Sequence, residues 1–585
     1  VFNQTGEDRE FGLTVSFAGP LVVEGPEVAG LRVPSGESRT AWLVLEATGT
    51  GPAEARVEVR SAGGGRPVGT EARGFFPIRP GNPLHTAAEF HRLEPGTSKT
   101  LAFDRAFLDG ARRRLRISAA PVLELRPALD RLMEYPYGCL EQTTSRLMAI
   151  VHAPQLLEGD DESRAALARE LIDAGLRRLA NLQTESGGLS YWPGGARASR
   201  WGTGYAGEFL VEARDAGVEI PSRLLTGILG YLQDELGSTG DHPPGANERA
   251  LFARVLAVLD RPPLGWLTRL SEEPEELDIA GRAHLAAAWV AAGRSDRALS
   301  VLGKDTMWIA VSTTTDGRLT SRVRQDAVLL KTLLELDPAH PWTDLLASRL
   351  VKRRENGAWR STLEDAAALS ALARYHRTRE SGTGSGAFVV EVTCGGARFA
   401  ADHQKPALIE LPEGDAPVHV EVAGEGAAFL IHETEGLARD AHVERYDRGV
   451  CVRREWRTPS GEPVELDSLS VGDLVRVEVT LRATEDRRIG NVAVVDPLPG
   501  GFEVENPRLD SSARMPRQRA ECDRVEFLDD RVVLFATANG HEQVFTYAIR
   551  ATGAGSFSVP PVQASCMYEP SVASISGGGR VEVAR

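Results

Sequence analysis

The spacing of hydrophobic residues divides the chain into β-rich outer parts and a helical middle. Over residues 1–79, apolar and polar side chains alternate in short runs such as Leu13, Val15 and Phe17, and Gly/Pro turns separate the runs. This alternation predicts strands with one buried face. The same pattern continues through residues 80–118, so strands are predicted for that stretch as well.

From about residue 120 the apolar positions follow the period of a helix. Apolar residues recur at i, i+3, i+4 and i+7, as at Leu225, Ile228, Leu229 and Leu232. Helices are predicted to continue to about residue 379, where the Ser/Gly/Thr segment 381–386 predicts a flexible joint. Alternating apolar positions then return and predict strands up to the last residue.

Two short strand groups, 80–118 and 387–440, flank the helical segment 119–380. Each group is too small to form a β-sandwich alone, but the two together can form one β-domain into which the helical domain is inserted. The predicted fold class is multidomain α+β, with further β-sandwiches at 1–79 and 441–585. A domain attached at two points can swing as a unit when its contacts are released.

Composition and charge narrow the class of protein. The chain has 585 residues, which corresponds to roughly three to five domains, and its 42% hydrophobic and 25% charged residues are ordinary for soluble proteins. The net charge of −15 argues against a nucleic-acid-binding surface. No apolar run approaches the roughly 18 residues of a membrane helix, and any export signal is expected to lie upstream of Val1 or to have been removed.

The segment 135–142 (Tyr-Pro-Tyr-Gly-Cys-Leu-Glu-Gln) carries the strongest chemical signal. Residues three apart share one face of a helix, so the Cys139 thiol can attack the Gln142 carboxamide, expel ammonia and form an internal thioester. Such a bond stores acylating power without a cofactor. The alternative is that Cys139 is a buried thiol that packs as a small hydrophobic residue. Gly138 is predicted to allow a backbone geometry that a Cβ atom would hinder.

The segment resembles the thioester motif of bacterial alpha-2-macroglobulins, relatives of complement C3 and animal alpha-2-macroglobulin. The bacterial proteins often carry Cys-Leu-Glu-Gln where the animal proteins carry Cys-Gly-Glu-Gln. Further stretches resemble the family in the same order, and they lie at 187–195, 356–362, 496–503, 529–535 and 566–570. The resemblance extends over residues 1–585 and is specific from Tyr135 onward.

This resemblance implies an identity for each domain. Residues 1–79 are expected to be a macroglobulin-like β-sandwich, and 80–118 with 387–440 a split CUB-like domain. Residues 119–380 are expected to be an α/α-toroid thioester domain. Residues 441–585 are expected to be a carboxyl-terminal macroglobulin-like domain, similar to the receptor-binding domains of the family, which helps to cover the thioester in relatives.

The resemblance also implies a function. In relatives, a protease cleaves a bait region and thereby exposes the thioester, and a lysine amine of the protease is then acylated by the former Gln142. The protein is expected to be a single-use protease inhibitor rather than an enzyme. Its expected partners are target proteases and upstream macroglobulin domains of the same chain, and no nucleic acid. The expected compartment is the periplasm, with a lipid anchor on an upstream segment as an open alternative.

Four residues near the predicted bond have open roles. Glu141 is either solvated helix surface or a group that polarises the site. Tyr135 and Tyr137 either pack in the core or gate the access of water, as a tyrosine near the motif is thought to do in relatives. His242 lies in the region where complement proteins carry a histidine that takes over the acyl group. The alternative is an exposed loop residue, which leaves direct aminolysis by lysine.

Four further cysteines, Cys394, Cys451, Cys522 and Cys566, permit two disulfides in an oxidising compartment or stay as buried thiols. Cys451 and Cys522 both fall in the last predicted domain. No Cys-x-x-Cys pair, His-Glu-x-x-His helix or P-loop is present, so no metal or cofactor is predicted.

Two other functions stay open beside the protease trap. One is a covalent adhesin or opsonin-like binder that uses the same bond without a bait region. The other is an inactive structural relative in which Cys139 is reduced.

Overall fold

Residues 1–585 divide into two units in the computed structural model, Val1–Leu84 and His85–Arg585. The structure describes residues 1–24, 27–62, 69–79, 84–102, 107, 111–119, 125–134, 138–152, 154, 161–311, 313–314, 319–355, 357–380, 386–404, 406–437, 445–505, 520 and 522–585. Within these residues, no helix combines the length and apolar character that a membrane crossing requires.

The first unit is a small β-structure. Its strands are β1 (Arg9–Ala18), β2 (Leu21–Glu24), β3 (Glu27–Val33), β4 (Val44–Ala47), β5 (Gly51–Ala62) and β6 (Gly69–Ile78). A four-stranded sheet has the order β3-β1-β5-β6, and β2 pairs with β4. The alternation read from the sequence places Phe11, Leu13 and Val15 on the buried face of β1.

The second unit begins with a β-domain that is built from two separate stretches of chain. The strands are β7 (Leu84–Leu93), β8 (Ser98–Leu101), β9 (Arg112–Ser118), β10 (Phe388–Cys394), β11 (Ala397–Asp402), β12 (Ala407–Glu410), β13 (Val418–Gly424) and β14 (Ala428–Leu437). They form two sheets, β11-β10-β13-β8 and β12-β9-β14-β7. Each sheet contains strands from before and after the helices, so the predicted insertion of a helical domain into a split β-domain is confirmed.

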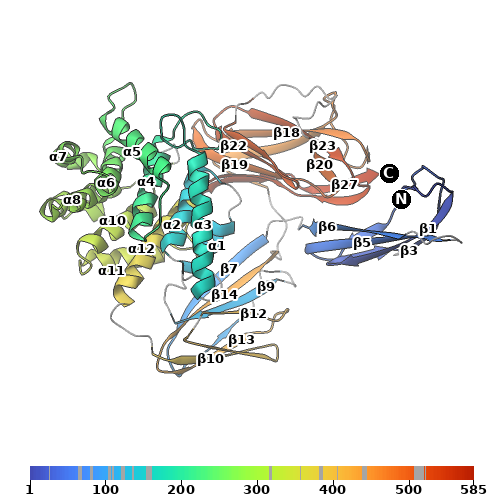
Figure 1. Ribbon diagram of the computed structural model, residues 1–585, viewed down its shortest axis with the longest axis horizontal. Coiled ribbons are helices and arrows are strands. Elements are labelled where there is room, and N and C mark those ends of the chain that lie inside the picture. Colours follow the sequence, from blue (N-terminus) through green and yellow to red (C-terminus); the bar gives the residue numbers. More distant parts are fainter. Residues whose placement is uncertain are drawn as a thin grey trace. The chain divides into compact units, whose positions relative to one another are not determined.

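The inserted domain consists of helices (Figure 1). Its helices are α1 (Arg126–Glu134), α2 (Leu140–His152), α3 (Asp161–Asn181), α4 (Arg200–Asp215), α5 (Ser222–Gly237), α6 (Ala246–Leu259), α7 (Leu264–Glu272), α8 (Ile279–Ala291), α9 (Ser295–Leu302), α10 (Arg322–Leu336), α11 (Trp342–Lys352) and α12 (Thr362–Glu380). The even-numbered helices contact in the order α2-α4-α6-α8-α10-α12, and α12 contacts α2 again. This closed contact order is the predicted α/α toroid, with the odd-numbered helices packed on its outside.

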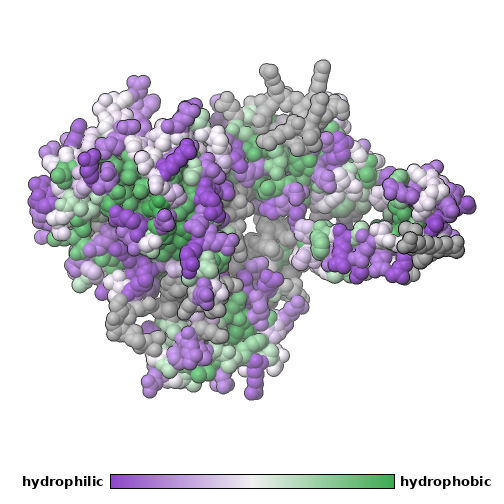
Figure 2. Space-filling view, in the orientation of Figure 1, coloured by the Kyte–Doolittle hydropathy of each residue, from purple (hydrophilic) through white to green (hydrophobic). Residues whose placement is uncertain are grey.

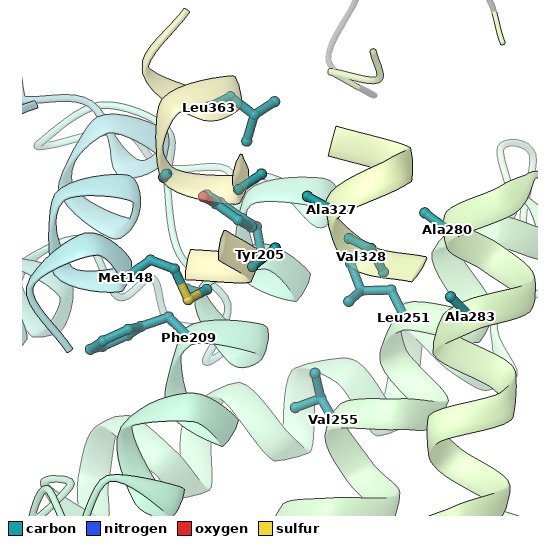
Figure 3. Close-up of a cluster of buried hydrophobic side chains, with 14 of the residues drawn as sticks. Met148, Tyr205, Phe209, Leu251, Val255, Ala280, Ala283, Ala327, Val328 and Leu363 are labelled. Atoms are coloured by element: carbon teal, nitrogen blue, oxygen red, sulfur yellow. The ribbon is translucent and has the colours of Figure 1, made fainter. Parts of the chain in front are cut away.

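Small residues let the inner helices approach closely. A Cβ atom on Gly204 of α4 would lie 2.8 Å from a ring carbon of Phe252 on α6, which is too close for a side chain larger than hydrogen. Figure 3 shows Phe209 of α4 beside Met148 of α2 and Leu251 of α6 beside Val328 of α10, with alanines of α8 and α10 in the same cluster. The inner helices are therefore buried around most of their circumference.

Charged side chains are also buried inside the ring. Lys331 of α10 donates hydrogen bonds to Glu208 Oε1 at 3.2 Å and to Glu212 Oε1 at 2.9 Å, and both glutamates belong to α4. Arg254 of α6 lies 3.4 Å from Glu208 Oε1. Burial disfavours the ionised form of Glu208, but Lys331, His284 and Arg254 outweigh it and lower the pKa of Glu208 to about 2. These charges join helices that are distant in sequence.

The outer helices carry the exposed surface of the toroid. Hydrophilic residues are spread over its visible face, with smaller hydrophobic areas between them (Figure 2). Large exposed apolar side chains occur one at a time on different helices, as at Leu264, Leu299 and Leu345. Scattered apolar residues of this kind are normal for a folded protein and identify no docking surface.

The last domain is a β-sandwich. Its strands are β15 (Tyr446–Arg448), β16 (Val450–Arg457), β17 (Leu469–Ser470), β18 (Leu474–Ala483), β19 (Ile489–Pro497), β20 (Phe502–Val504), β21 (Arg524–Phe527), β22 (Arg531–Ala538), β23 (Gln543–Ala551), β24 (Gly555–Val559), β25 (Val562–Cys566), β26 (Glu569–Ser576) and β27 (Gly579–Ala584). A long sheet, β20-β23-β18-β16-β15-β26-β25-β19-β22-β21, accompanies a smaller one, β17-β27-β24. The turn between β25 and β26 consists of Met567 and Tyr568.

The observed layout confirms the predicted fold class. The first and last residues predicted for each domain stay predictions. The bounds of helices and strands do not determine at which residue one domain ends and the next begins.

The buried ion pairs of the ring generate a stability prediction. Replacing Lys331 with Ala leaves Glu208 and Glu212 without their shared ammonium partner, which costs about 3–5 kcal/mol of unfolding free energy for a buried charge that loses its partner. We expect the thermal midpoint, followed by circular dichroism of the helices at 222 nm, to fall by several degrees. Lys304→Ala, an exposed lysine of the same domain, is the control and should leave the midpoint unchanged. Equal midpoints for the two variants would contradict the prediction.

Candidate functional site

Cys139 and Gln142 are placed together by the start of helix α2. The helix begins at Leu140, so Cys139 is its N-cap residue and Gln142 its third helical residue. The backbone N–H of Cys139 donates to Gln142 Oε1 at 3.2 Å, and the backbone N–H of Gln142 hydrogen-bonds to the Cys139 thiol. This reciprocal pattern is a capping box, in which a cysteine takes the position that is usually held by Ser or Thr. The capping interaction brings the thiol and the carboxamide to the same end of the helix.

Both reactive groups are sheltered from solvent. Cys139 has no exposed surface and Gln142 is 4% exposed. Burial disfavours the thiolate, and the nearby Glu141 carboxylate adds to this effect, so the pKa of Cys139 rises to about 12. The thiol is therefore neutral at pH 7. A reaction that needs the thiolate requires a nearby group that accepts the thiol proton.

Glu141 lies at the centre of a buried hydrogen-bond network. The Ser145 hydroxyl donates to Glu141 Oε1 at 2.5 Å, the Tyr568 hydroxyl donates to Oε2 at 2.9 Å, and the Thr362 hydroxyl lies 3.0 Å from Oε2. Burial raises the pKa of Glu141, and the three hydroxyls moderate this rise. The interpretation of Glu141 as solvated helix surface is wrong, because its side chain has no exposed surface.

Residues of the last domain cover the reactive pair. The Gln142 amide nitrogen Nε2 lies 3.5 Å from Met567 Sδ. The Tyr568 hydroxyl hydrogen-bonds to the Cys139 thiol and to the Tyr191 hydroxyl. Tyr191 also hydrogen-bonds to the thiol, and its carbonyl oxygen accepts from Leu140 N at 2.9 Å. The pair is thus enclosed by aromatic and thioether side chains.

The last domain, whose residues Met567 and Tyr568 cover the reactive pair, makes a second aromatic contact with the helical domain. The rings of Trp192 and Phe535 have their centroids 4.4 Å apart, and Phe535 lies on β22 of the last domain. The Arg524 guanidinium lies 5.7 Å from the centroid of the Trp192 ring. Trp192, in the loop between α3 and α4, therefore packs against the last domain.

The opposite side of the site is formed by the start of α12. Thr362, the first residue of α12, reaches Glu141 from there. The preceding Trp359 is buried, and its indole N–H donates to the Leu350 carbonyl oxygen at 2.9 Å. Trp359 thus packs between α11 and α12 and holds the start of α12 in place.

Gly138 leaves room for a neighbouring side chain rather than for an unusual backbone conformation. Its φ is not in the left-handed region, so the backbone conformation does not demand glycine. A Cβ atom on Gly138 would instead collide with the Arg178 guanidinium, which donates to the Gly138 carbonyl oxygen at 2.8 Å, so the arginine side chain would have to move. The prediction about backbone geometry is wrong, and the close approach of Arg178 replaces it.

The other predicted site residues lie apart from the pair or outside the description. Tyr135 and Tyr137 lie outside the described residues, so their roles stay predictions. His242 is exposed in the loop between α5 and α6, where its carbonyl oxygen accepts from Arg200 at 2.9 Å. Its proposed role in acyl transfer also stays a prediction. Cys451 carries a free thiol, so the pairing of Cys451 with Cys522 is not formed.

Several residues of the site lie in stretches that resemble the family, although the sequence analysis gave these residues no role. Tyr191, Thr362, Met567 and Tyr568 all fall in stretches that resemble the family, at 187–195, 356–362 and 566–570. Their contacts with Cys139, Glu141 and Gln142 join segments far apart in sequence, and a single sequence does not reveal such contacts. Ser145 carries no comparable signal.

Comparison with known families and proteins extends the resemblance. Residues 449–571 match the family model described as the bacterial alpha-2-macroglobulin MG10 domain. The alpha-2-macroglobulin of Xylella fastidiosa strain Temecula1 is 28% identical over 633 residues, which cover 99% of this chain and 37% of the relative. The Escherichia coli K12 alpha-2-macroglobulin is 25% identical over 624 residues, covering 97% and 36%. The chain thus spans little more than a third of the length of these relatives.

Solved structures share the fold. The crystal structure of native Escherichia coli alpha-2-macroglobulin from domain MG7 to the C-terminus superposes with a TM-score of 0.83 at 23% identity, and it covers 100% of this chain and 96% of that one. Salmonella alpha-2-macroglobulin reacted with methylamine gives a TM-score of 0.80 at 23% identity and covers 100% and 39%. The chain is therefore similar in sequence and in fold to the carboxyl-terminal portion of bacterial alpha-2-macroglobulins, as its motifs predicted.

Proposed function

We propose that this chain is the thioester-bearing portion of an alpha-2-macroglobulin-like inhibitor that traps proteases and acylates their lysine side chains. The carrying observation is the capping box at the start of α2, which holds the Cys139 thiol beside the Gln142 carboxamide in a buried site. Similarity to proteins named alpha-2-macroglobulin supports the proposal.

The proposed bond forms by an internal acyl transfer. The sulfur of Cys139 attacks the carboxamide carbon of Gln142, the carbon–nitrogen bond breaks, and ammonia leaves. The Cys139 N–H that donates to Gln142 Oε1 stabilises the negative charge that develops on this oxygen during the attack. The thioester then persists because water is excluded from the site.

The second step is consumption of the bond by an amine. A lysine of the target attacks the acyl carbon, which yields an amide at residue 142 and a free thiol at Cys139. Each molecule reacts once, so the protein is an inhibitor and not an enzyme. For this step the cover formed by Met567 and Tyr568 has to move away from α2. In the proposed mechanism this follows protease cleavage in an upstream bait region.

The proposal extends to compartment and partners. We place the protein in the periplasm, where incoming proteases are met, with upstream macroglobulin domains of the same protein supplying the bait region. A lipid anchor on an upstream segment belongs to the same proposal. No cofactor or metal takes part in the proposed chemistry.

Methylamine tests the presence of the bond. Intact-mass spectrometry of the native chain should show the loss of one ammonia relative to the sequence mass. Methylamine should then add at residue 142 and release one titratable thiol at Cys139. The Salmonella relative that was reacted with methylamine makes this amine a suitable probe. Cys139→Ala should keep the full sequence mass and bind no methylamine.

The matched control is Cys394→Ala, which removes another buried thiol in the split β-domain. It should behave like the natural chain. A native chain of full sequence mass that never adds methylamine would refute the thioester.

Removing the cover should expose the bond. Tyr568→Ala deletes a ring that contacts both Cys139 and Glu141, so methylamine should react at least about tenfold faster, which corresponds to about 1.4 kcal/mol of lost protection. The rate is measured by the appearance of thiol. Tyr446→Ala, an exposed tyrosine on β15 of the same domain, is the control and should react at the natural rate. An unchanged rate in Tyr568→Ala would show that this turn does not shield the site.

Protease trapping is tested in the longest natural form of the protein. After incubation with an endopeptidase, denaturing electrophoresis should show conjugates of protein and protease, with an amide between residue 142 and a protease lysine by tandem mass spectrometry. Blocking the protease active site beforehand should abolish the conjugates, because the bait region then stays uncut. Conjugates that form equally well with a blocked protease would favour the covalent adhesin or opsonin-like binder.

A further inference from the structure

Glu141 is an unusual carboxylate because it is buried with neutral partners only. Its contacts are the hydroxyls of Ser145, Thr362 and Tyr568, and no cation pairs with it in the part of the chain that the structure describes. Burying an ionised carboxylate costs several kcal/mol, and three neutral hydroxyls offset only part of this cost. A neutral glutamine of similar size would avoid this cost, although it offers one acceptor oxygen instead of two. A buried carboxylate with neutral partners only points to a chemical role beside its hydrogen bonds.

The thioester reaction needs a group that accepts a proton. The thiolate is the nucleophilic form of cysteine. With a pKa of about 12, the buried Cys139 thiol is ionised in only about one molecule in 100,000 at pH 7. Efficient attack on Gln142 therefore requires that the thiol proton leaves as the sulfur–carbon bond forms.

The structure contains a path for this proton. The Tyr568 hydroxyl hydrogen-bonds to the Cys139 thiol and donates to Glu141 Oε2 at 2.9 Å. The three groups form a continuous chain from sulfur through phenol oxygen to carboxylate. We propose that Glu141 is the proton acceptor for thioester formation and that Tyr568 relays the proton from Cys139 to it. This inference rests on the proposed function.

The proposed step balances in atoms and charge. As the sulfur attacks the Gln142 carbonyl carbon, the thiol proton passes to the Tyr568 oxygen and the phenol proton passes to Glu141. The carbon–nitrogen bond then breaks, and the proton returns from Glu141 through Tyr568 to the departing nitrogen, which leaves as ammonia. Glu141 is ionised again at the end. No external reactant is consumed.

The other titratable groups around Glu141 do not serve as the acceptor. Tyr191, from the loop before α4, contacts the thiol and Tyr568, and burial raises its pKa well above the usual value. Tyr205 of α4 contacts Ser145, and burial likewise raises its pKa. The groups that reach Glu141 from α2 and α12 are the neutral hydroxyls of Ser145 and Thr362. Glu141 is therefore the one base among the described groups of this site.

The tests measure the rate of ammonia loss after the reduced, denatured chain is returned to native conditions. If the chain does not refold, the same rate is measured after cell-free synthesis. At pH 7, Glu141→Gln should form the bond about 100-fold more slowly or worse, the usual contribution of a general base. Its rate should rise about tenfold per pH unit, because the thiol must then ionise on its own. The natural chain should show a rate that is nearly independent of pH above the pKa of Glu141.

Tyr568→Phe keeps the ring but removes the relay hydroxyl, and it should show the same slow, pH-dependent formation. Thr144→Val removes a buried hydroxyl of the same helix that donates to the Leu140 carbonyl oxygen and not to Glu141, so it is the control and should keep the natural pH profile. The pH dependence of the rate distinguishes a proton relay from a packing role. If Glu141 and Tyr568 only pack in the site, their variants show the same pH dependence as the natural chain.

The outcomes distinguish the two proposals. Ammonia loss at equal rates and equal pH dependence in the natural chain, Glu141→Gln and Tyr568→Phe overturns the relay and leaves the thioester standing. A natural chain that never loses ammonia overturns the thioester and the relay with it. If Glu141→Gln does not fold, as judged by circular dichroism, Tyr568→Phe decides on the relay.

Discussion

The capping box between Cys139 and Gln142 is the interaction on which the site depends. The first turn of any helix leaves backbone N–H groups without partners, and a capping box satisfies two of them for about 1 kcal/mol. In α2 these N–H groups bind the thiol and the carboxamide oxygen. The interaction is local, so it can form as soon as the helix forms. Secondary structure therefore positions the two reactive groups, and the tertiary structure has only to keep water away from them.

Exclusion of water is divided among several parts of the chain. Tyr191 comes from a loop before α4, Thr362 from the start of α12, and Met567 and Tyr568 from the last domain. All of these contacts converge on the three residues Cys139, Glu141 and Gln142. Because Tyr568 donates to the buried Glu141 carboxylate, withdrawing the last domain removes both a cover and a hydrogen-bond donor. The carboxylate then gains by becoming hydrated, so exposure and hydration of the site reinforce each other.

The sequence predicted the architecture because each level of the fold leaves a local pattern. Periods of two and of about four residues separated strands from helices, and strand groups too short to stand alone indicated the inserted domain. The spacing of Cys139 and Gln142 predicted their meeting, since it depends on one helical turn. The cover was not predictable in this way, because Tyr568 reaches Glu141 across more than 400 residues of sequence.

Glu141 shows where reasoning from periodicity fails. An acidic residue beside apolar ones on a helix is usually assigned to the solvent face. In a closed ring, the inner helices contact neighbours on both sides and α2 is also covered at its start, so no solvent face remains there. The same geometry buries Glu208 and Lys331, whose charges are satisfied by each other. Polar residues of inner helices therefore mark internal contacts in this fold, and sequence alone does not show that the ring closes.

Closure of the ring also limits how the proposed trap can open. Each inner helix is held by two neighbours, and buried ion pairs join α4, α6 and α10. Separating α2 from α4 or α12 would break this packing along its whole length, whereas the turn of Met567 and Tyr568 meets the site through few side chains. The less costly movement is a displacement of the toroid and the last domain relative to each other as intact bodies. The split β-domain, which holds the toroid at both of its ends, permits such a movement without unfolding any helix.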